Sequence, residues 1–257
     1  MFMKKLIFTI FVASGLLNAS TITKEECEKK GESYIFAGGE CINFKKYNGE
    51  TKGKLNIVVH GKWDEKTNTL GRYAPFAENL SFETDINTVA IALPGYSNSS
   101  TNNIKSLSSG ENLAFTKEYV ELLSSLVSQL KTKYNANIVT YIGHSAGCTM
   151  GINLVGEKPF LINNLLCAGG SYKLDEKNKS EDKISAMDVI DNIDRRTKIT
   201  LVYGSEDKIS TPKQTKDFYE FAKKEGLDVK LVEATGSQHL DLDMTEASVN
   251  AIVELVE

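Results

Sequence analysis

The sequence predicts an α/β fold in which a mostly parallel sheet is covered by helices on both faces. From residue 55 to the end of the chain, short apolar runs rich in β-branched residues alternate with amphipathic segments, which is typical of α/β proteins. The predicted strands of this region are residues 55–60, 87–93, 138–142, 160–168, 199–203 and 229–232. The predicted helices are residues 74–80, 111–134, 146–155, 186–195, 212–225 and 246–256.

The composition is that of an ordinary globular chain. Its 257 residues are 41% hydrophobic and 25% charged, which suffices for one large α/β domain, and no repeat or linker interrupts the pattern. The net charge is −4, and the basic residues are mostly lysines scattered through the sequence. This distribution argues against a nucleic-acid-binding protein.

The first 19 residues predict a secretory signal peptide. Two lysines precede an apolar run at residues 6–17, which is short for a membrane span, and small residues follow it. We therefore expect a secreted or periplasmic protein with no membrane span after signal cleavage. Leu17 replaces the small residue preferred three positions before a cut after Ala19, so an uncleaved N-terminal anchor stays open. The predicted organisation is a signal peptide at 1–19, a hairpin segment at 20–54 and a core at 55–257, the last two in one domain.

Export changes how the four cysteines are interpreted, because an oxidising compartment favours disulfides. Residues 33–37 and 41–46 predict two strands joined by a turn at Gly38-Gly39. Cys27 and Cys41 flank this hairpin, and we expect them to form a disulfide. Cys148 and Cys167 could pair as well, or could remain buried free thiols.

A candidate nucleophile follows the predicted strand at residues 138–142. The segment Gly143 to Gly147 reads GHSAG, a G-x-S-x-G motif between a strand and a helix. The glycines allow a turn too tight for Cβ atoms, and this turn exposes the central serine above the edge of the sheet. Ser145 is therefore the predicted nucleophile.

A base and an acid are expected beyond other strand ends, because functional groups of parallel sheets collect at the carboxyl ends of the strands. Asp207 follows the strand at residues 199–203, and His239 follows the strand at residues 229–232. Ser145, Asp207 and His239 then form a nucleophile, acid and base in chain order. Glu206 is the nearest alternative acid.

The base is identified by elimination, since the chain has only three histidines. His60 ends an early strand, and His144 is the variable residue of the GHSAG motif. Only His239 is placed to accept the Ser145 proton.

An oxyanion formed during attack on a carbonyl group needs preorganised N–H donors. The Ala146 N–H begins the helix after Ser145 and is the first candidate. The second is the Lys62 N–H, in the turn that follows the strand at residues 55–60, with Trp63 as the alternative.

At this point the sequence resembles the α/β-hydrolase superfamily over residues 55–257. The matching segments are VVHG at 58–61, LPGYSNS at 93–99, GHSAG at 143–147, YGSEDKIS at 203–210 and GSQH at 236–239. The resemblance implies an eight-stranded, largely parallel sheet whose antiparallel second strand comes from the N-terminal hairpin. It also implies acyl-enzyme chemistry on Ser145 with water as the second reactant, and we expect no cofactor and no metal.

The expected activity is that of a carboxylesterase on small or polar esters, with the loop at residues 97–109 at the rim of the pocket. The segment at residues 171–185 is short and charged, which disfavours a lid-gated lipase. A serine peptidase or polyester hydrolase remains open, as does a cofactor-free lyase or acyltransferase. A non-catalytic binding protein that retains the fold is the alternative of a different class. The sequence indicates no oligomeric state.

Overall fold

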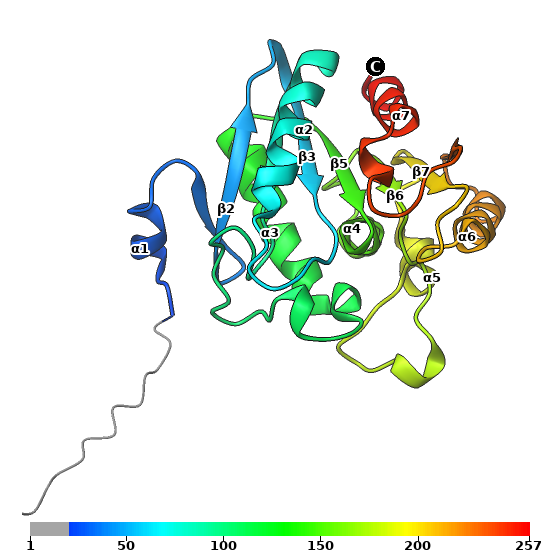
Figure 1. The fold of residues 1–257 in the computed structure, drawn as a ribbon, viewed down its shortest axis with the longest axis horizontal. Helices are drawn as coiled ribbons and strands as arrows, with labels where there is room; N and C mark the ends of the chain where they lie inside the picture. The colour runs from blue at the N-terminus through cyan, green and yellow to red at the C-terminus, as the bar shows by residue number, and fades with distance from the viewer. Residues whose placement is uncertain (1–20) are drawn as a thin grey trace, which may run out of the picture.

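The computed structural model describes residues 21–257, and the predicted signal peptide lies outside these residues. Eight strands form one sheet in the order β1-β2-β4-β3-β5-β6-β7-β8 (Figure 1). The strands are β1 (Tyr34–Ala37), β2 (Glu40–Tyr47), β3 (Thr51–Val59), β4 (Ile86–Ile91), β5 (Ile138–His144), β6 (Asn164–Ala168), β7 (Lys198–Gly204) and β8 (Val229–Ala234). β2 pairs antiparallel with β1 and β4, and all other pairs are parallel. The predicted fold class and the antiparallel second strand are confirmed.

Within residues 21–257, seven α-helices pack around this sheet. They are α1 (Lys24–Glu28), α2 (Thr69–Thr84), α3 (Lys117–Lys133), α4 (Ala146–Glu157), α5 (Ala186–Val189), α6 (Pro212–Lys224) and α7 (Glu246–Val256). α2 contacts α7, and α3 contacts α4. The two pairs lie on opposite faces of the sheet (Figure 1). No helix between residues 21 and 257 is both long and apolar enough to cross a bilayer.

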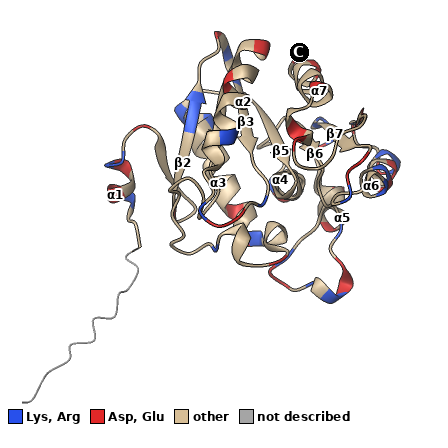
Figure 2. Ribbon diagram, in the orientation of Figure 1, with Lys and Arg blue, Asp and Glu red and all other residues tan. Residues whose placement is uncertain are grey.

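Charges of both signs occur on the same elements. Helix α6, for example, carries both lysines and acidic residues along its length (Figure 2).

The N-terminal hairpin has the two-residue turn that the sequence predicts. Ala37 pairs with Glu40, which leaves Gly38 and Gly39 as the turn. Their φ angles are 57° and 83°, and glycine adopts such left-handed angles most easily. Because β2 also pairs with β4, the hairpin belongs to the same sheet as the strands after residue 54.

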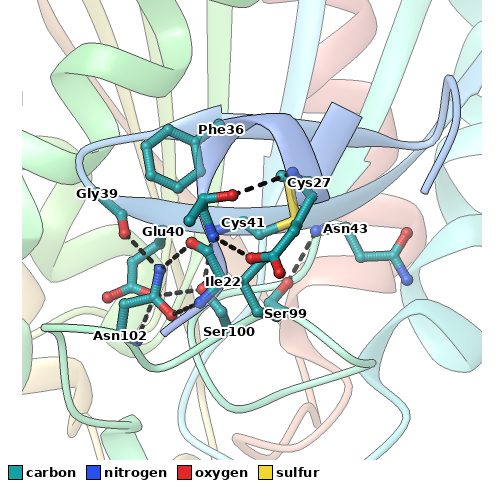
Figure 3. Close-up of a disulfide and its surroundings, with 12 residues drawn as sticks. Ile22, Cys27, Phe36, Gly39, Glu40, Cys41, Asn43, Ser99, Ser100 and Asn102 are labelled. Atoms are coloured by element: carbon teal, nitrogen blue, oxygen red, sulfur yellow. Dashed lines mark hydrogen bonds between the residues drawn. A yellow bond between two sulfur atoms is a disulfide. The ribbon is translucent and has the colours of Figure 1, made fainter. Parts of the chain in front are cut away.

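A disulfide fastens α1 to the hairpin. Cys27 of α1 and Cys41 of β2 are bonded, with 5.5 Å between their Cα atoms, and neither side chain is exposed (Figure 3). The loop entropy that such a cross-link removes from the unfolded chain stabilises a fold by about 3 kcal/mol.

The polar loop after β4 is fixed to the hairpin by one buried carboxylate. Glu40 is fully buried and accepts hydrogen bonds from the Ser100 hydroxyl and the Asn102 N–H (Figure 3). It also accepts from the N–H groups of Asn103 and Ile104, and all four bonds are within 2.9 Å. Four donors compensate the cost of burying a charge. The predicted long loop is therefore ordered, and part of it is buried.

Three predicted elements have wrong boundaries, and the first is the strand expected at residues 55–60, which begins at Thr51. The helix expected at residues 74–80 begins at Thr69, because the Asn68 side chain caps it by accepting from the Gly71 N–H, and Pro75 lies inside it. The strand expected at residues 160–168 begins only at Asn164. Phe160 has a φ of 72°, which places it in a turn before the strand.

Two predicted helices are also shorter than expected. The helix expected at residues 111–134 opens with a separate 3₁₀ turn (Leu113–Phe115), and α3 starts at Lys117. The helix expected at residues 186–195 is α5 followed by one 3₁₀ turn (Ile190–Asn192).

Candidate active site

The turn between β5 and α4 holds Ser145 in a strained conformation. Its φ and ψ angles are 53° and −116°, a region that non-glycine residues rarely adopt. A Cβ atom at Gly143 would lie 2.6 Å from the Gly147 carbonyl oxygen, and one at Gly147 would collide with the Val59 carbonyl oxygen of β3. Both glycines of the motif are therefore required sterically, as the sequence predicted.

Three side chains from three strand ends meet at this turn. The Ser145 Oγ lies 2.9 Å from the His239 Nε2, and the His239 Nδ1 lies 2.7 Å from an Asp207 carboxylate oxygen. Because a carboxylate can only accept, the Nδ1 carries a proton and the Nε2 of the neutral ring is free to accept the Ser145 proton. The structure thus brings Ser145, Asp207 and His239 into one hydrogen-bonded chain.

The acid is held by the backbone of its own loop. Asp207 is 3% exposed, and its second carboxylate oxygen accepts from the N–H groups of Ile209 and Ser210 at 2.8 and 2.9 Å. Glu206, the alternative acid, points to the surface. The geometry therefore favours Asp207 over Glu206 as the partner of His239.

Two backbone N–H groups are candidates for binding an oxyanion. Lys62 and Ala146 line the same cavity as Ser145, and within residues 21–257 neither N–H donates to a protein acceptor. Ala146 is the first residue of α4, where N–H groups have no partner inside the helix and the helix dipole favours negative charge. A Cβ atom at Gly61 would lie 2.8 Å from the Ser145 Cβ, so the chain before Lys62 passes directly against the serine.

His60 fixes this chain. The ring is fully buried; its Nδ1 donates to the Gly61 carbonyl at 2.7 Å, and its Nε2 accepts from the Leu93 N–H at 3.0 Å. Burial lowers the pKa of His60 to about 4, so the ring is neutral at physiological pH. His60, at the end of β3, thus ties the turn before Lys62 to the segment after β4.

Two cavities flank Ser145. One has a volume of about 300 Å³ and includes Trp63, Ile209, His239 and Leu240. The other has a volume of about 180 Å³, and its wall includes apolar side chains from the two 3₁₀ turns before α3. Leu107, within the loop expected at the rim, lines the second cavity. A substrate with its carbonyl at Ser145 could therefore extend a group into each cavity.

Sequence reasoning missed two residues at the mouth of the site. Ile209 and Leu240 are 71% and 55% exposed and line the larger cavity. Each is an apolar residue in a polar loop, one or two positions after a member of the hydrogen-bonded chain. That position in the sequence was the signal that could have identified them.

A second disulfide lies under the turn. Cys148 in the first turn of α4 is bonded to Cys167 of β6, with 4.7 Å between the Cα atoms, and both are fully buried. The structure therefore favours pairing, one of the two alternatives that the sequence left open.

Within the described part of the chain, no cluster of three His, Cys, Asp or Glu side chains could hold a metal ion.

Comparisons with known proteins support the fold. No protein-family model and no curated protein matches the sequence, but many solved structures match its three-dimensional structure. Esterase Pf2001 of Pyrococcus furiosus superimposes with a TM-score of 0.66 at 16% identity, over 87% of this chain and 90% of that chain. Est1E of Butyrivibrio proteoclasticus, with ferulic acid bound, superimposes with a TM-score of 0.62 at 16% identity, over 88% of this chain and 96% of that chain. A predicted CIB-like hydrolase of Thermoplasma acidophilum superimposes with a TM-score of 0.61 at 17% identity, over 87% of this chain and 96% of that chain. At these identities the comparisons establish the architecture, and this chain has the α/β-hydrolase fold.

Proposed function

We propose that this protein is a serine hydrolase that cleaves carboxylic esters through an acyl-enzyme on Ser145. The observation that carries the proposal is the hydrogen-bonded chain from Ser145 through His239 to Asp207, together with the two cavities that Ser145 lines. A strained serine with a neutral imidazole at 2.9 Å is the arrangement that nucleophilic catalysis requires.

The reaction follows from the positions of these groups. The His239 Nε2 takes the proton as the Ser145 Oγ attacks the ester carbonyl carbon, and the new oxyanion is bound by the N–H groups of Ala146 and Lys62. Asp207 stabilises the imidazolium. His239 then gives the proton to the leaving alcohol oxygen, and the carbon–oxygen bond to the alcohol breaks. Water repeats the sequence on the acyl-enzyme, which releases the acid and restores Ser145.

The cavity sizes support small esters as substrates. Pockets that enclose drug-sized ligands have volumes of about 300 Å³ or more. The larger cavity, of about 300 Å³, is at this lower limit, and the smaller one, of about 180 Å³, is below it. The segment at residues 171–185 contributes one 3₁₀ turn (Glu176–Asn178) and no long insertion that could form a lid. One of the similar solved structures, Pf2001, is described as an esterase, and another, Est1E, holds ferulic acid, which supports ester over amide chemistry.

A fluorophosphonate probe tests the nucleophile. We expect the wild-type protein to be labelled once, at Ser145, and the Ser145→Ala variant to take up no label. Ser180→Ala is the matched control, because Ser180 is exposed and lines neither cavity beside Ser145, and it should be labelled like the wild type. Labelling that persists in Ser145→Ala would refute the assignment, and a wild-type protein that is never labelled would refute the serine hydrolase.

We also propose that the protein acts outside the cytoplasm. Two disulfides and the predicted signal peptide support export, because disulfides persist in oxidising compartments. Intact-mass analysis of exported protein should show a mass gain of two hydrogens per disulfide upon reduction and an N-terminus near residue 20. Exported material with four free thiols would contradict the proposal.

A further inference from the structure

His144, the variable residue of the nucleophile turn, lies under the candidate base. Its Nε2 is 2.9 Å from the backbone carbonyl oxygen of His239, and the centres of the two imidazole rings are 5.2 Å apart. The His144 side chain is 4% exposed. A carbonyl can only accept, so the His144 Nε2 must carry a proton. The Nδ1 of the neutral ring then accepts from the Tyr73 hydroxyl at 3.1 Å. Both ring nitrogens are satisfied in this tautomer alone.

The next carbonyl of the same loop is also held by a side chain. The Arg72 Nη2 donates to the Leu240 carbonyl at 2.9 Å and to the Asp241 carboxylate at 2.6 Å. Its guanidinium group lies over the rings of Trp63 and Tyr73, 5.1 and 5.8 Å from their centres. Two consecutive carbonyls are therefore fixed by donors from β5 and α2.

The loop has few other restraints around His239. Between residues 21 and 257, the N–H groups of His239, Leu240 and Asp241 donate to no protein acceptor. The only further bond to the His239 carbonyl among these residues comes from the Leu242 N–H at 3.4 Å, which is longer than the bond from His144. The backbone position of His239 thus depends strongly on His144.

A buried carboxyl group faces the other side of the His144 ring. Asp243 is 1% exposed, its nearer oxygen lies 3.8 Å from the His144 Nδ1, and in the described residues neither oxygen has a hydrogen-bond partner. Burial raises the pKa of Asp243, and burial lowers the pKa of His144. Both directions favour a neutral pair, which preserves the tautomer that donates to His239.

We propose that His144 is a positioning residue for His239. Its Nε2–H holds the His239 carbonyl so that the opposite end of that residue, the ring Nε2, stays within hydrogen-bond distance of the Ser145 Oγ. The inference rests on the proposed hydrolase function. It adds a role for a motif position that the catalytic chain itself does not use. Small displacements of a catalytic group lower turnover by up to about 100-fold.

Two variants separate the donor from the volume of the side chain. His144→Leu fills the space without a donor, whereas His144→Gln retains an N–H at the end of the side chain. With a short-chain aryl ester, kcat of His144→Leu should fall about 10- to 100-fold, with KM close to the wild-type value. His144→Gln should recover most of the loss. The rate of fluorophosphonate labelling should fall in parallel with kcat, at a melting temperature near that of the wild type.

Two further measurements apply if His144→Leu does not fold. Tyr73→Phe removes only the hydroxyl that fixes the tautomer and should lower kcat less than His144→Leu, with unchanged KM. In the wild-type protein, ¹⁵N NMR of the imidazoles should place a proton on the His144 Nε2.

The outcomes distinguish this inference from the function on which it rests. A ring protonated only at Nδ1, wild-type kcat in folded His144→Leu, or equal losses in the Leu and Gln variants would each overturn the positioning role. Wild-type protein that neither hydrolyses esters nor takes up the probe would contradict the proposed function instead, and the NMR tautomer would still decide the contact between His144 and His239.

Discussion

Asp207 can be tested apart from the shape of its loop. One oxygen accepts from two backbone N–H groups, and the other faces His239. In Asp207→Asn the amide oxygen can keep the backbone bonds, but the amide nitrogen then faces the ring and favours the wrong tautomer. We expect kcat to fall by about 10⁴-fold, with the melting temperature little changed. Steady-state kinetics beside the exposed control Glu206→Gln, which should stay near the wild type, provide the check. A near-normal rate in Asp207→Asn would remove it from the catalytic chain.

His60 should make the stability of the protein depend on pH. Its pKa is about 4 in the folded state and about 6.5 in an unfolded chain. Below pH 6.5 the unfolded chain therefore binds a proton that the folded protein does not, and the free energy of unfolding falls as the pH decreases towards 4. Between pH 7 and pH 4.5 this costs the wild type about 2 kcal/mol more than it costs His60→Gln. Urea unfolding of both proteins at the two pH values measures the difference. If the free energy of unfolding fell equally in both proteins, the lowered pKa of His60 would be refuted.

At the scale of elements, the two disulfides fasten different parts of the fold. Cys27–Cys41 joins α1 to the hairpin, more than 100 residues before Ser145 in the sequence, whereas Cys148–Cys167 joins the start of α4, three residues after Ser145, to β6. Their sequence separations of 14 and 19 residues are similar, so the loop-entropy contribution of each is about 3 kcal/mol.

We therefore expect the two disulfides to differ in their effect on catalysis. Cys27→Ala/Cys41→Ala and Cys148→Ala/Cys167→Ala should both lower the melting temperature, but only the second should also lower kcat, because α4 carries the Ala146 N–H. Thermal unfolding and ester kinetics on the two double variants check this. Equal kcat values in both would mean that the second disulfide does not position the turn.

For the whole molecule, local sequence signals predicted the sheet and the residues that meet at its edge. Alternating strands and helices specified the sheet, and the scarcity of histidine singled out His239, which the structure places beside Ser145. Contacts between distant positions that no motif or strand end marks were not predictable. The bond from His144 to the His239 carbonyl joins positions 95 residues apart, and only the fold brings them together. The start of α2 was missed because Pro75 disfavours a helix interior locally, whereas the cap at Asn68 and the packing of α2 on the sheet override it.

The size of the whole active-site opening leads to a prediction about substrates. The cavity of about 180 Å³ suits a short acyl chain, and the exposed Ile209 and Leu240 offer only an open apolar rim to longer ones. We expect kcat/KM for an aryl butyrate to exceed that for an aryl hexadecanoate by about tenfold or more, since chain carbons outside a pocket gain little from burial. A panel of aryl esters beside aminoacyl arylamides measures this. Preference for the long chain would contradict the small-ester assignment, and faster cleavage of the arylamides would make the protein a peptidase that uses the same three residues.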